Sequence, residues 1–349
     1  MKTQYANHNA TCHEPGQSRD VTSRAMRCTK QALLGLCVIS ALGVSFTANA
    51  AYPQRPIEVI ISFPPAGATD AMARAVSQAL AVELGQSLVV QNRPGGGGTI
   101  GAAAAARSAP DGYTLYFAAT TNQAIGATMY PNQPAHLGKD FTPIGQVGFA
   151  PHALVVPSSL PVKTVSELLA YLKKNPGQYN FASQGAGTLS HLESALFVST
   201  NNLDVTHVPY KGSVQALPDL ANGVATFMFD SVTGSMPMVQ AGKIRYLAVA
   251  STSRVSMLPD VPTLGEAGVP NVVADNVFGF FAPAGTPEPV VATLSAALEK
   301  VLAQPELRQR LAAQGSELKF APSAEFAKTI AQEHEYWGRV AAAANLAGK

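Results

Sequence analysis

Short apolar runs rich in β-branched residues alternate with helical stretches along residues 51–349, and this alternation constrains the fold more than any other feature. The run "IEVIISF" at 57–63 is a nearly continuous apolar strand, and a helix from about Asp70 to Leu84 follows it. Apolar strands without polar alternation indicate a sheet whose two faces are both covered by helices. The pattern therefore predicts an α/β fold with a mostly parallel sheet.

The length of this region favours two lobes, because about 300 residues exceed the usual single domain of about 100 to 200 residues. We expect lobe 1 to comprise residues 51–150 and 275–349, and lobe 2 to comprise residues 151–274. The chain would cross between them near residue 150 and again within 250–280. The segment "IGQVGFAPHALVV", at 144–156, predicts two successive strands at the first crossing. A capping box of Thr164 and Glu167 then begins a helix in lobe 2.

The first fifty residues have the pattern of a secretory signal peptide. An apolar run follows Arg27 and Lys30 and ends in Ala-Asn-Ala, the small-residue pattern that precedes a cleavage site. We expect cleavage near Ala50 and an exported mature protein. A start at Met26 would leave a presequence of ordinary length, so translation beginning there is an alternative.

Cysteine and charge content limit the possible functions. All three cysteines, Cys12, Cys28 and Cys37, lie in the predicted signal peptide, which leaves no disulfide, thiol nucleophile or cysteine metal site in the mature chain. Residues 51–349 retain 19 of the 24 Lys and Arg residues and 20 of the 22 Asp and Glu residues. This near-neutral balance gives no indication of binding to nucleic acid or to a membrane surface.

The glycine run in "RPGGGGTIG" satisfies the pattern G-x-G-x-x-G at Gly96 to Gly101. A dinucleotide site also needs an acidic residue about twenty positions further on. Ala118 to Thr121 stand there, so we interpret the run as a turn that lets a helix pack closely on the sheet. We predict no cofactor.

Hydrolase and metal motifs are also missing. The sequence has no G-x-S-x-G, and its one S-x-x-K match at Ser316 to Lys319 lacks the companion motifs of penicillin-binding enzymes. The histidines of the mature region show no i, i+4 spacing that would favour a zinc site: they are His136, His152, His191, His207 and His334.

Small and hydroxyl residues gather where four predicted strands end. In an open α/β sheet, ligands bind beyond the carboxyl ends of the strands, where loops and helix N-termini converge. We therefore predict one ligand cleft between the lobes, formed by Ser62 to Asp70, Thr120 to Gln123 (hence Thr120, Thr121 and Asn122), Ser183 to Thr188, and Asp230 to Ser231.

The loop "FPPAGATD" is the most informative of these strand ends. Its prolines and Gly67 would hold an open loop whose N–H groups, with those of the following helix, suit an anion such as a carboxylate. Asp70 would cap that helix and anchor bridging waters, or would form an i, i+4 pair with Arg74.

Several motifs in this order resemble the Bug/TctC family, the periplasmic solute receptors of tripartite tricarboxylate transporters. They are "FPPAGATDAMAR", "VQNRPGGGGTIG", "DGYTLYFA", "NFASQGAGTLSHL", "VPYKGSVQALPDLANG", "FMFDS", "LPDVPTLGEAG" and "FAPAGTPEPVV". The resemblance covers essentially all of residues 51–349 and implies a two-lobed periplasmic binding protein that closes over a small carboxylate.

The resemblance also implies which residues contact the ligand. The first loop would hold one carboxylate, partly through two ordered waters, and the opposite lobe would contribute the "SQGAGTLSH" loop and the "FMFDS" strand end. These segments supply Phe63, Ala66, Gly67, Ala68, Thr69 and Asp70, then Ser183, Gln184, Gly187, Thr188 and His191, and finally Asp230. Ala66 departs from the family's usual second glycine, and "DNVFGFF" replaces a more aromatic stretch near the hinge.

We predict a monomeric receptor that binds a carboxylate without catalysis and delivers it to the membrane components of a transporter. A periplasmic hydrolase using Thr188 or Ser183 with His191 as base is one alternative, and a sensory protein presenting its ligand to a membrane signalling partner is another. No arginine lies in the proposed contact loops, so neutral donors and water would hold the ligand. Aromatic acids, dicarboxylates, nicotinate-like compounds and amides remain open.

Overall fold

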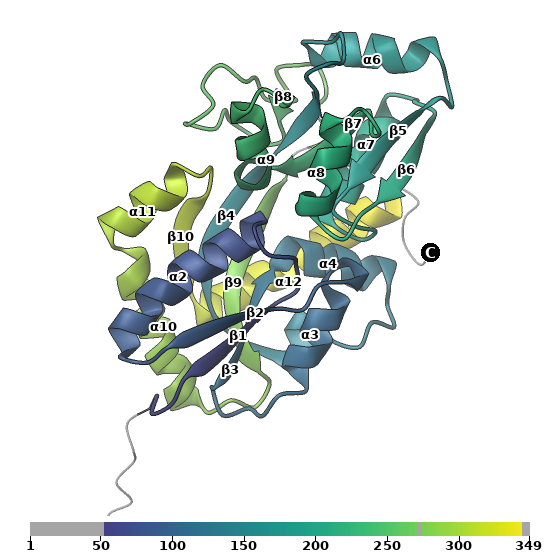
Figure 1. Cartoon of the computed structure of the whole chain (residues 1–349). Coiled ribbons are helices and arrows are strands. Elements are labelled where there is room, and N and C mark those ends of the chain that lie inside the picture. The colour runs from purple at the N-terminus through teal and green to yellow at the C-terminus, as the bar shows by residue number, and fades with distance from the viewer. Residues whose placement is uncertain (1–51, 271, 273, 344–349) are drawn as a thin grey trace, which may run out of the picture. The chain divides into compact units, whose positions relative to one another are not determined.

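A computed structural model describes residues 52–343, except 271 and 273, so the predicted signal peptide lies outside the described residues (Figure 1). The strands are β1 (Ile57–Ile61), β2 (Leu88–Asn92), β3 (Thr114–Ala119), β4 (Phe141–Pro157), β5 (Tyr179–Ser183), β6 (Val205–Pro209), β7 (Phe227–Ser231), β8 (Ile244–Val249), β9 (Asp275–Pro283) and β10 (Glu317–Pro322). The helices are α2 (Ala68–Leu84), α3 (Thr99–Ala106), α4 (Thr120–Met129), α5 (Leu137–Asp140), α6 (Val165–Lys174), α7 (Leu189–Thr200), α8 (Ser213–Ala221), α9 (Val232–Gln240), α10 (Glu288–Leu302), α11 (Pro305–Ala312) and α12 (Ser323–Ala343), with a short 3-10 turn at Gly96–Gly98.

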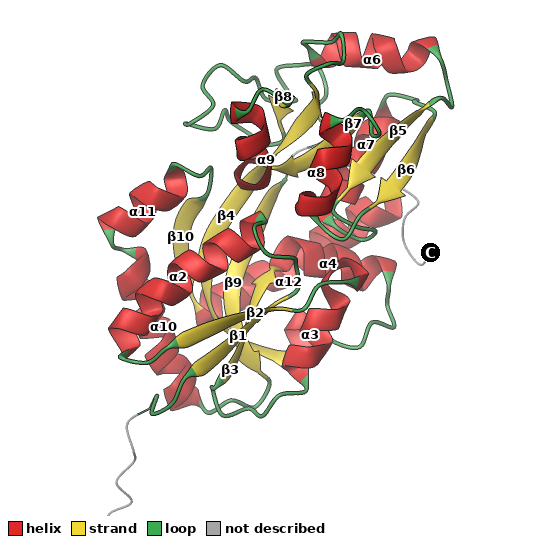
Figure 2. Cartoon of the chain, in the orientation of Figure 1, coloured by secondary structure: helices red, strands yellow, loops and turns green. Residues whose placement is uncertain are grey.

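The strands form two groups that share β4. The order β2-β1-β3-β9-β4-β7-β5-β6 is continuous, and β10 and β8 also pair with β4. We define lobe 1 by β1, β2, β3, β9 and β10 with their helices, and lobe 2 by β5, β6, β7 and β8 with theirs. Figure 2 shows the two groups of strands with helices around each. The predicted α/β, two-lobed fold class is confirmed.

Both faces of the lobe 1 sheet are buried, as its apolar strands predict. Ile57, Val59 and Ile61 of β1 pack with α2, α10 and α11 in one cluster. Ile60, which points to the other face, packs with α3 and α12 in a second cluster. Successive side chains of a strand point to opposite faces, so apolar residues on both faces of β1, with Glu58 as its one polar residue, are what two covered faces require.

Lobe 2 repeats this arrangement with other helices. Phe181 of β5 packs with α6 and α7 on one face. Its neighbour Ala182 packs with α8 on the opposite face. The helix α6 begins as predicted, because the Thr164 side chain accepts a hydrogen bond of 3.1 Å from the backbone N–H of Glu167.

A single long strand joins the lobes where the sequence predicted two successive strands. Along β4, Gly145 to Pro151 pairs with β9, and His152 to Val155 pairs with β7. The two-strand expectation was wrong because Gly145, Gln146 and Gly148 interrupt the apolar pattern, while the pairing with β9 continues through them with register shifts. The partners of β4 change between Pro151, opposite Asp275, and His152, opposite Ser231.

The helix α12 returns to lobe 1 at the end of the chain and packs along α4 and β4. Its Phe326 and Ile330 complete the cluster around α3, and Trp337 packs against Ile125 and Met129 of α4. No helix among the described residues is long and apolar enough to cross a membrane.

Candidate functional site

A cleft of about 620 Å³ lies between loops of both lobes. Lobe 1 contributes two strand-end loops and the segment after α4, and lobe 2 contributes the loops after β5 and β6. We call this space the cleft; its lining residues are Ser62, Phe63, Gly95 to Thr99, Met129 to Pro134, Gln184 to Ala186, Tyr210 and Lys211.

A much smaller cavity of about 20 Å³, here called the notch, lies beside the cleft. Phe63 and Gln184 line both spaces. The other lining residues come from the starts of helices and from the hinge strand β9: they are Pro64, Gly67 to Thr69, Gly212 to Val214, Ser231 and Asn276. The notch has room for about one water-sized group.

Two helix N-termini from opposite lobes meet at the notch, and neither has a side-chain cap. The first backbone hydrogen bond of α2 runs from Ala71 N–H to the Gly67 carbonyl, so the N–H groups before Ala71 lack helical partners. In α8 the first such bond runs from Gln215 N–H to the Gly212 carbonyl. Free N–H groups and two helix dipoles therefore converge on one point, which favours an anion there.

Asp70 holds the first loop and does not line the cleft. Its carboxylate accepts hydrogen bonds from the Ala66 N–H at 3.0 Å, from Arg74 Nε at 2.9 Å and from Asn92 Nδ2 at 2.9 Å. Burial alone would raise the pKa of Asp70, but these hydrogen bonds and the Arg74 charge lower it on balance. The predicted pairing with Arg74 is confirmed, whereas the N-cap position belongs to Gly67.

Ala66 adopts the left-handed conformation, with φ of 67°. This conformation favours glycine and costs an L-residue about 1 to 2 kcal/mol. The Asp70 hydrogen bond to Ala66 N–H therefore holds the loop in a conformation that Ala66 itself disfavours.

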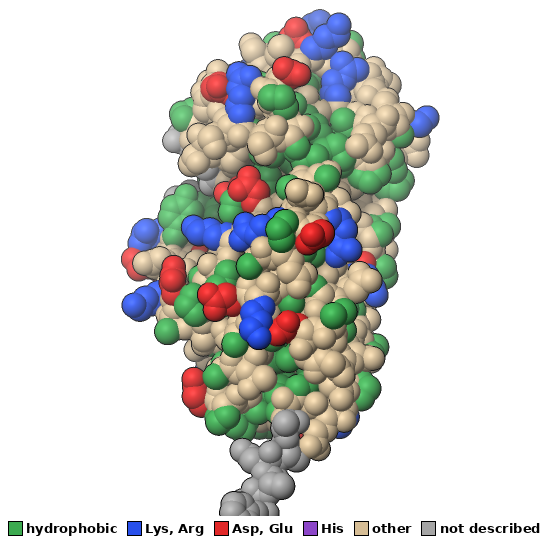
Figure 3. Space-filling model, turned by 90° about the vertical axis from the view of Figure 1, so that its left-hand side faces the viewer, with side chains coloured by type: hydrophobic (Ala, Val, Ile, Leu, Met, Phe, Trp, Pro, Cys, Tyr) green, Lys and Arg blue, Asp and Glu red, His purple; other side chains and the backbone are tan. Residues whose placement is uncertain are grey.

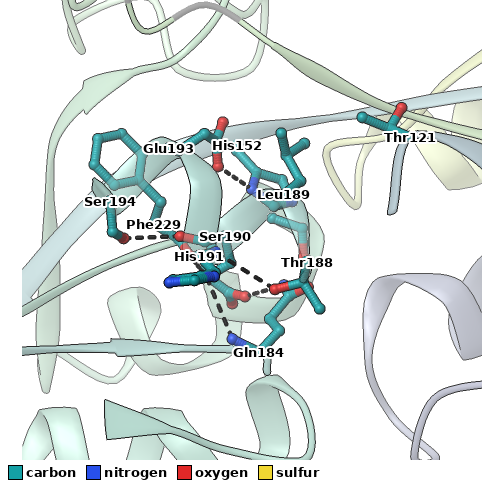
Figure 4. Close-up of polar contacts among 12 residues, drawn as sticks. Thr121, His152, Gln184, Thr188, Leu189, Ser190, His191, Glu193, Ser194 and Phe229 are labelled. Atoms are coloured by element: carbon teal, nitrogen blue, oxygen red, sulfur yellow. Dashed lines mark hydrogen bonds and ion pairs between the residues drawn. The ribbon is translucent and has the colours of Figure 1, made fainter. Parts of the chain in front are cut away.

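Thr120 and Thr121 bond to the C-terminal helix and lie outside the cleft lining. Both hydroxyls donate to Glu333 of α12, each at 2.6 Å. Burial raises the pKa of Glu333 to about 7, although these two hydrogen bonds act in the opposite direction. Figure 4 shows Thr121 apart from the group around Thr188 and His191. Asn122 accepts a 2.7 Å hydrogen bond from Leu189 N–H and so joins α4 to the start of α7.

Gln184 is the one residue of the predicted Ser183, Gln184, Gly187, Thr188 and His191 set that lines the cleft and the notch. Thr188 caps α7, accepting from His191 N–H at 3.4 Å and donating to the Gly185 carbonyl at 2.7 Å. Gly187 packs on Tyr130, because a Cβ atom placed on Gly187 would lie 2.9 Å from that ring. These contacts shape the loop that carries Gln184.

The histidine ring of His191 stacks on that of His207, with centroids 4.0 Å apart. Ser183 is fully buried and its hydroxyl lies 2.7 Å from His207 Nε2. Burial, with His191 nearby, lowers the pKa of His207 to about 3. Ser183 Oγ also accepts a hydrogen bond of 3.2 Å from the backbone N–H of Gly185.

Asp230 lies behind the wall of the notch and is fully buried. Its Oδ1 accepts hydrogen bonds from Gln184 Nε2 and from Ser213 Oγ, the latter at 2.6 Å. Burial raises its pKa, and these two donors and His152 oppose the shift. Asp230 thus orients two residues of the notch and does not face the notch itself.

The hinge side of this wall contains a buried pair, His152 of β4 and Glu193 of α7, whose Nδ1 and Oε2 atoms lie 2.7 Å apart (Figure 4). Burial would lower the pKa of His152, but the charge and hydrogen bond of Glu193 raise it on balance. The pair joins lobe 2 to the strand that connects the lobes.

Sequence reasoning missed several residues of both cavities. The glycine run Gly95 to Gly98, interpreted only as a packing turn, lines the cleft together with Tyr130, Tyr210 and Lys211. Ser213 and Asn276 line the notch. The rule that ligands lie at strand ends applies equally to the loops after β2 and β6, and it could have identified the glycine run and Tyr210 to Ser213.

Lys211 is the one charged residue among those that line the cleft and the notch. No group of three or more His, Cys, Asp and Glu side chains within the described part of the chain is arranged to hold a metal ion. On the face shown in Figure 3, acidic and basic side chains are interspersed and form no continuous basic patch.

The family model and a relative of similar length place the chain in one family. Residues 72–346 match the Tripartite tricarboxylate transporter family receptor. Protein BugT of Bordetella pertussis is 35% identical over 311 residues, which cover 88% of this chain and 95% of that protein.

Two solved structures are similar in fold and sequence. R. palustris Rpa4515 with adipate has a TM-score of 0.83 at 32% identity and covers 86% of this chain and 100% of its own. MatC from Rhodopseudomonas palustris with bound malate has a TM-score of 0.77 at 33% identity and covers 83% of this chain and 99% of its own. The predicted resemblance is confirmed, and the chain belongs to the tripartite tricarboxylate transporter family of receptors, which are periplasmic solute-binding proteins.

Proposed function

We propose that this protein is an exported receptor that captures a small carboxylate between its lobes and delivers it to the membrane components of a tripartite transporter. The proposal rests on one observation: the N-termini of α2 and α8, which have no side-chain cap, meet at the notch. The adipate and malate bound by the two similar structures are carboxylates, which supports the same chemistry.

The carboxylate would be held mainly by backbone donors. One oxygen, or a bridging water, would occupy the notch between the starts of the two helices, and the body of the ligand would lie in the cleft. Phe63, Gly67, Ala68, Thr69 and Gln184 would contact the ligand.

A second group of the predicted site residues would act indirectly. Asp70 and Ala66 shape the first loop, Thr188, Gly187, Ser183 and His191 shape the lobe 2 loop, and Asp230 orients Gln184. Thr120, Thr121 and Asn122 join α4 to α12 and α7 at the hinge.

The lobes would close by bending where β4 and β9 cross, near residue 150 and within 250–280, and separate near the notch to admit the ligand. Scattering should show a smaller radius of gyration when ligand is present.

Export would remove the presequence near Ala50, and N-terminal sequencing of the secreted protein would locate the cleavage site.

Thermal-shift screening of residues 52–349 against carboxylates and matched amides tests the function. A ligand at 100 times its dissociation constant stabilises the folded state by about 2.7 kcal/mol. If only uncharged compounds raised the melting temperature, the carboxylate proposal would be wrong.

A backbone variant tests the helix N-termini directly. Ala68 is the first residue of α2, where proline is compatible with a helix but has no N–H to donate. Ala68→Pro should weaken carboxylate binding by roughly 10- to 150-fold, as expected for one hydrogen bond to a charged group. Glu288→Pro, at the first position of α10, is the matched control and should leave binding unchanged.

A further inference from the structure

The charged groups that line the cleft can neutralise one negative charge on a ligand. Lys211 is the one charged residue lining it, and Lys211 immediately precedes Gly212, the N-cap of α8. The Lys211 backbone is thus beside the N-terminus of α8, and in the proposed complex its ammonium group would serve the same end of the ligand as the two helix N-termini. A second carboxylate further along the cleft would meet no cation among the lining residues, and a charge removed from water without a partner is costly.

The distal wall of the cleft is uncharged and largely apolar. It consists of the segment Met129 to Pro134, which contains two prolines and a tyrosine, with Asn132 and Gln133 as its polar members. Neutral amides of this kind hydrogen-bond to a hydroxyl, carbonyl or amide group and do not neutralise a charge.

Two tyrosine rings from opposite lobes line the cleft. The hydroxyl of Tyr210 donates to Asp219 Oδ2 at 2.8 Å, which fixes the ring from lobe 2. The ring of Tyr130, from lobe 1, packs closely on Gly187. Aromatic side chains bind flat rings by stacking or edge contacts that add to simple burial of area.

Glycine backbone forms much of the remaining wall, beside Ser62, Phe63, Thr99, Gln184 and Ala186. Gly95 to Gly98 of lobe 1 and Gly185 of lobe 2 line the cleft, and all five have φ values between 58° and 140°. Glycine at these positions lets a ligand approach the peptide planes closely. A flat body fits such walls better than a branched or puckered one.

We propose that the preferred guest of this cleft is an aromatic carboxylate with one negative charge, bound with its ring between Tyr130 and Tyr210 and its uncharged distal substituent toward Asn132. This inference rests on the proposed carboxylate-binding function and narrows it to one class.

Isothermal titration of residues 52–349 with benzoate, cyclohexanecarboxylate, 4-carbamoylbenzoate, terephthalate and adipate tests the class. Benzoate should bind about 3- to 10-fold more tightly than its saturated analogue, the size of an aromatic pair contribution. The monoanion 4-carbamoylbenzoate should bind at least about 10-fold more tightly than terephthalate, which has the same shape and a second charge.

Variants test the two recognition elements separately. Tyr130→Leu should remove the preference for benzoate over cyclohexanecarboxylate, whereas Tyr171→Leu, a tyrosine that stacks on Tyr179 instead of lining the cleft, should preserve it. Asn132→Lys should strengthen terephthalate binding selectively, because it supplies a cation to the distal wall.

Tighter binding of terephthalate or adipate than of the aromatic monoanions would overturn the inference while leaving the carboxylate function intact. An unchanged ring preference in Tyr130→Leu would also overturn it. If none of the carboxylates bound, both the proposed function and this inference would be wrong.

Discussion

Gly97 of lobe 1 and Ala186 of lobe 2 are in contact across the cleft, and a Cβ atom added to Gly97 would lie 2.6 Å from the Ala186 carbonyl oxygen. Nearby, a Cβ atom on Gly212 would lie 3.0 Å from the ring of Pro64. Glycine at these positions permits the lobes to approach through their backbones. Ligand affinity should therefore depend on residues that need not touch the ligand.

Gly97→Ala should weaken ligand binding by obstructing closure. Overpacking of this kind costs about 1 to 3 kcal/mol, which corresponds to roughly 5- to 150-fold in affinity. Titration with the best ligand of the thermal-shift screen measures the effect. Gly242→Ala is the control, because Gly242 has a similar φ of 66° but no atom within 4 Å of an added Cβ. Equal affinities in the two variants would contradict the closure argument.

Asp70→Asn should destabilise the protein by about 1 to 3 kcal/mol near neutral pH, because a buried acceptor of three hydrogen bonds loses its charge. The folded-state pKa of Asp70 is lowered, so its stabilisation is present above the unfolded pKa of about 3.9 and is lost as pH falls through the folded value. Urea unfolding between pH 2 and 7 should show the variant and the wild type converging in acid. Asp260→Asn, an exposed change, should leave the pH profile of stability unaltered.

Ala66→Gly should stabilise the folded state by up to about 1 kcal/mol, since removal of the left-handed strain outweighs the added freedom of the unfolded chain. Thermal denaturation provides the measurement. Asn202→Gly is a useful comparison, because Asn202 also has a positive φ, of 51°, but asparagine tolerates that conformation. The gain at Ala66 should exceed the gain at Asn202, and the reverse order would refute the strain argument.

Glu333→Gln should change how stability depends on pH. The folded pKa of Glu333, about 7, exceeds its ordinary value of 4.5, so the wild type is most stable below pH 4.5 and loses stability as pH rises to 7. The variant does not titrate and should be roughly 3 kcal/mol more stable than the wild type at pH 8, with little difference at pH 4. Glu335→Gln, an exposed change on the same helix, is the control. A constant difference across pH would contradict the assignment.

The sequence predicted the fold class and the first site loop for clear physical reasons. Apolar residues at four of the five positions of β1, on both of its faces, required two covered faces, and the loop from Phe63 to Asp70 contained proline and glycine where a strand ended. Both patterns depend on residues that are neighbours in the chain. They can therefore be recognised in the sequence without a structure.

The contacts that join distant segments could not be predicted in this way. Thr120 and Thr121 occur at a strand end, like a ligand contact, but Glu333 lies more than 200 residues further on and accepts both hydroxyls. Asp230 has the expected position, yet the side chains of Gln184 and Ser213 separate it from the notch. The sequence shows that these residues are polar and near the cleft, but the partner that satisfies each one is set by tertiary packing.

The position of β9 between β3 and β4 has a consequence for how the chain reaches its native state. All strands of lobe 2 precede β9, so β5, β6, β7 and β8 are complete before β9, the second partner of β3 after β1, has been synthesised. Until β9 has paired with β3, that edge of β3 is open and Phe117 lacks its stacking partner Phe278. Unpaired apolar strands are prone to association. A chain truncated before β9 should therefore show protected amides in β5 and β7 by hydrogen exchange but an unprotected edge at β3, and it should aggregate more readily than the full chain.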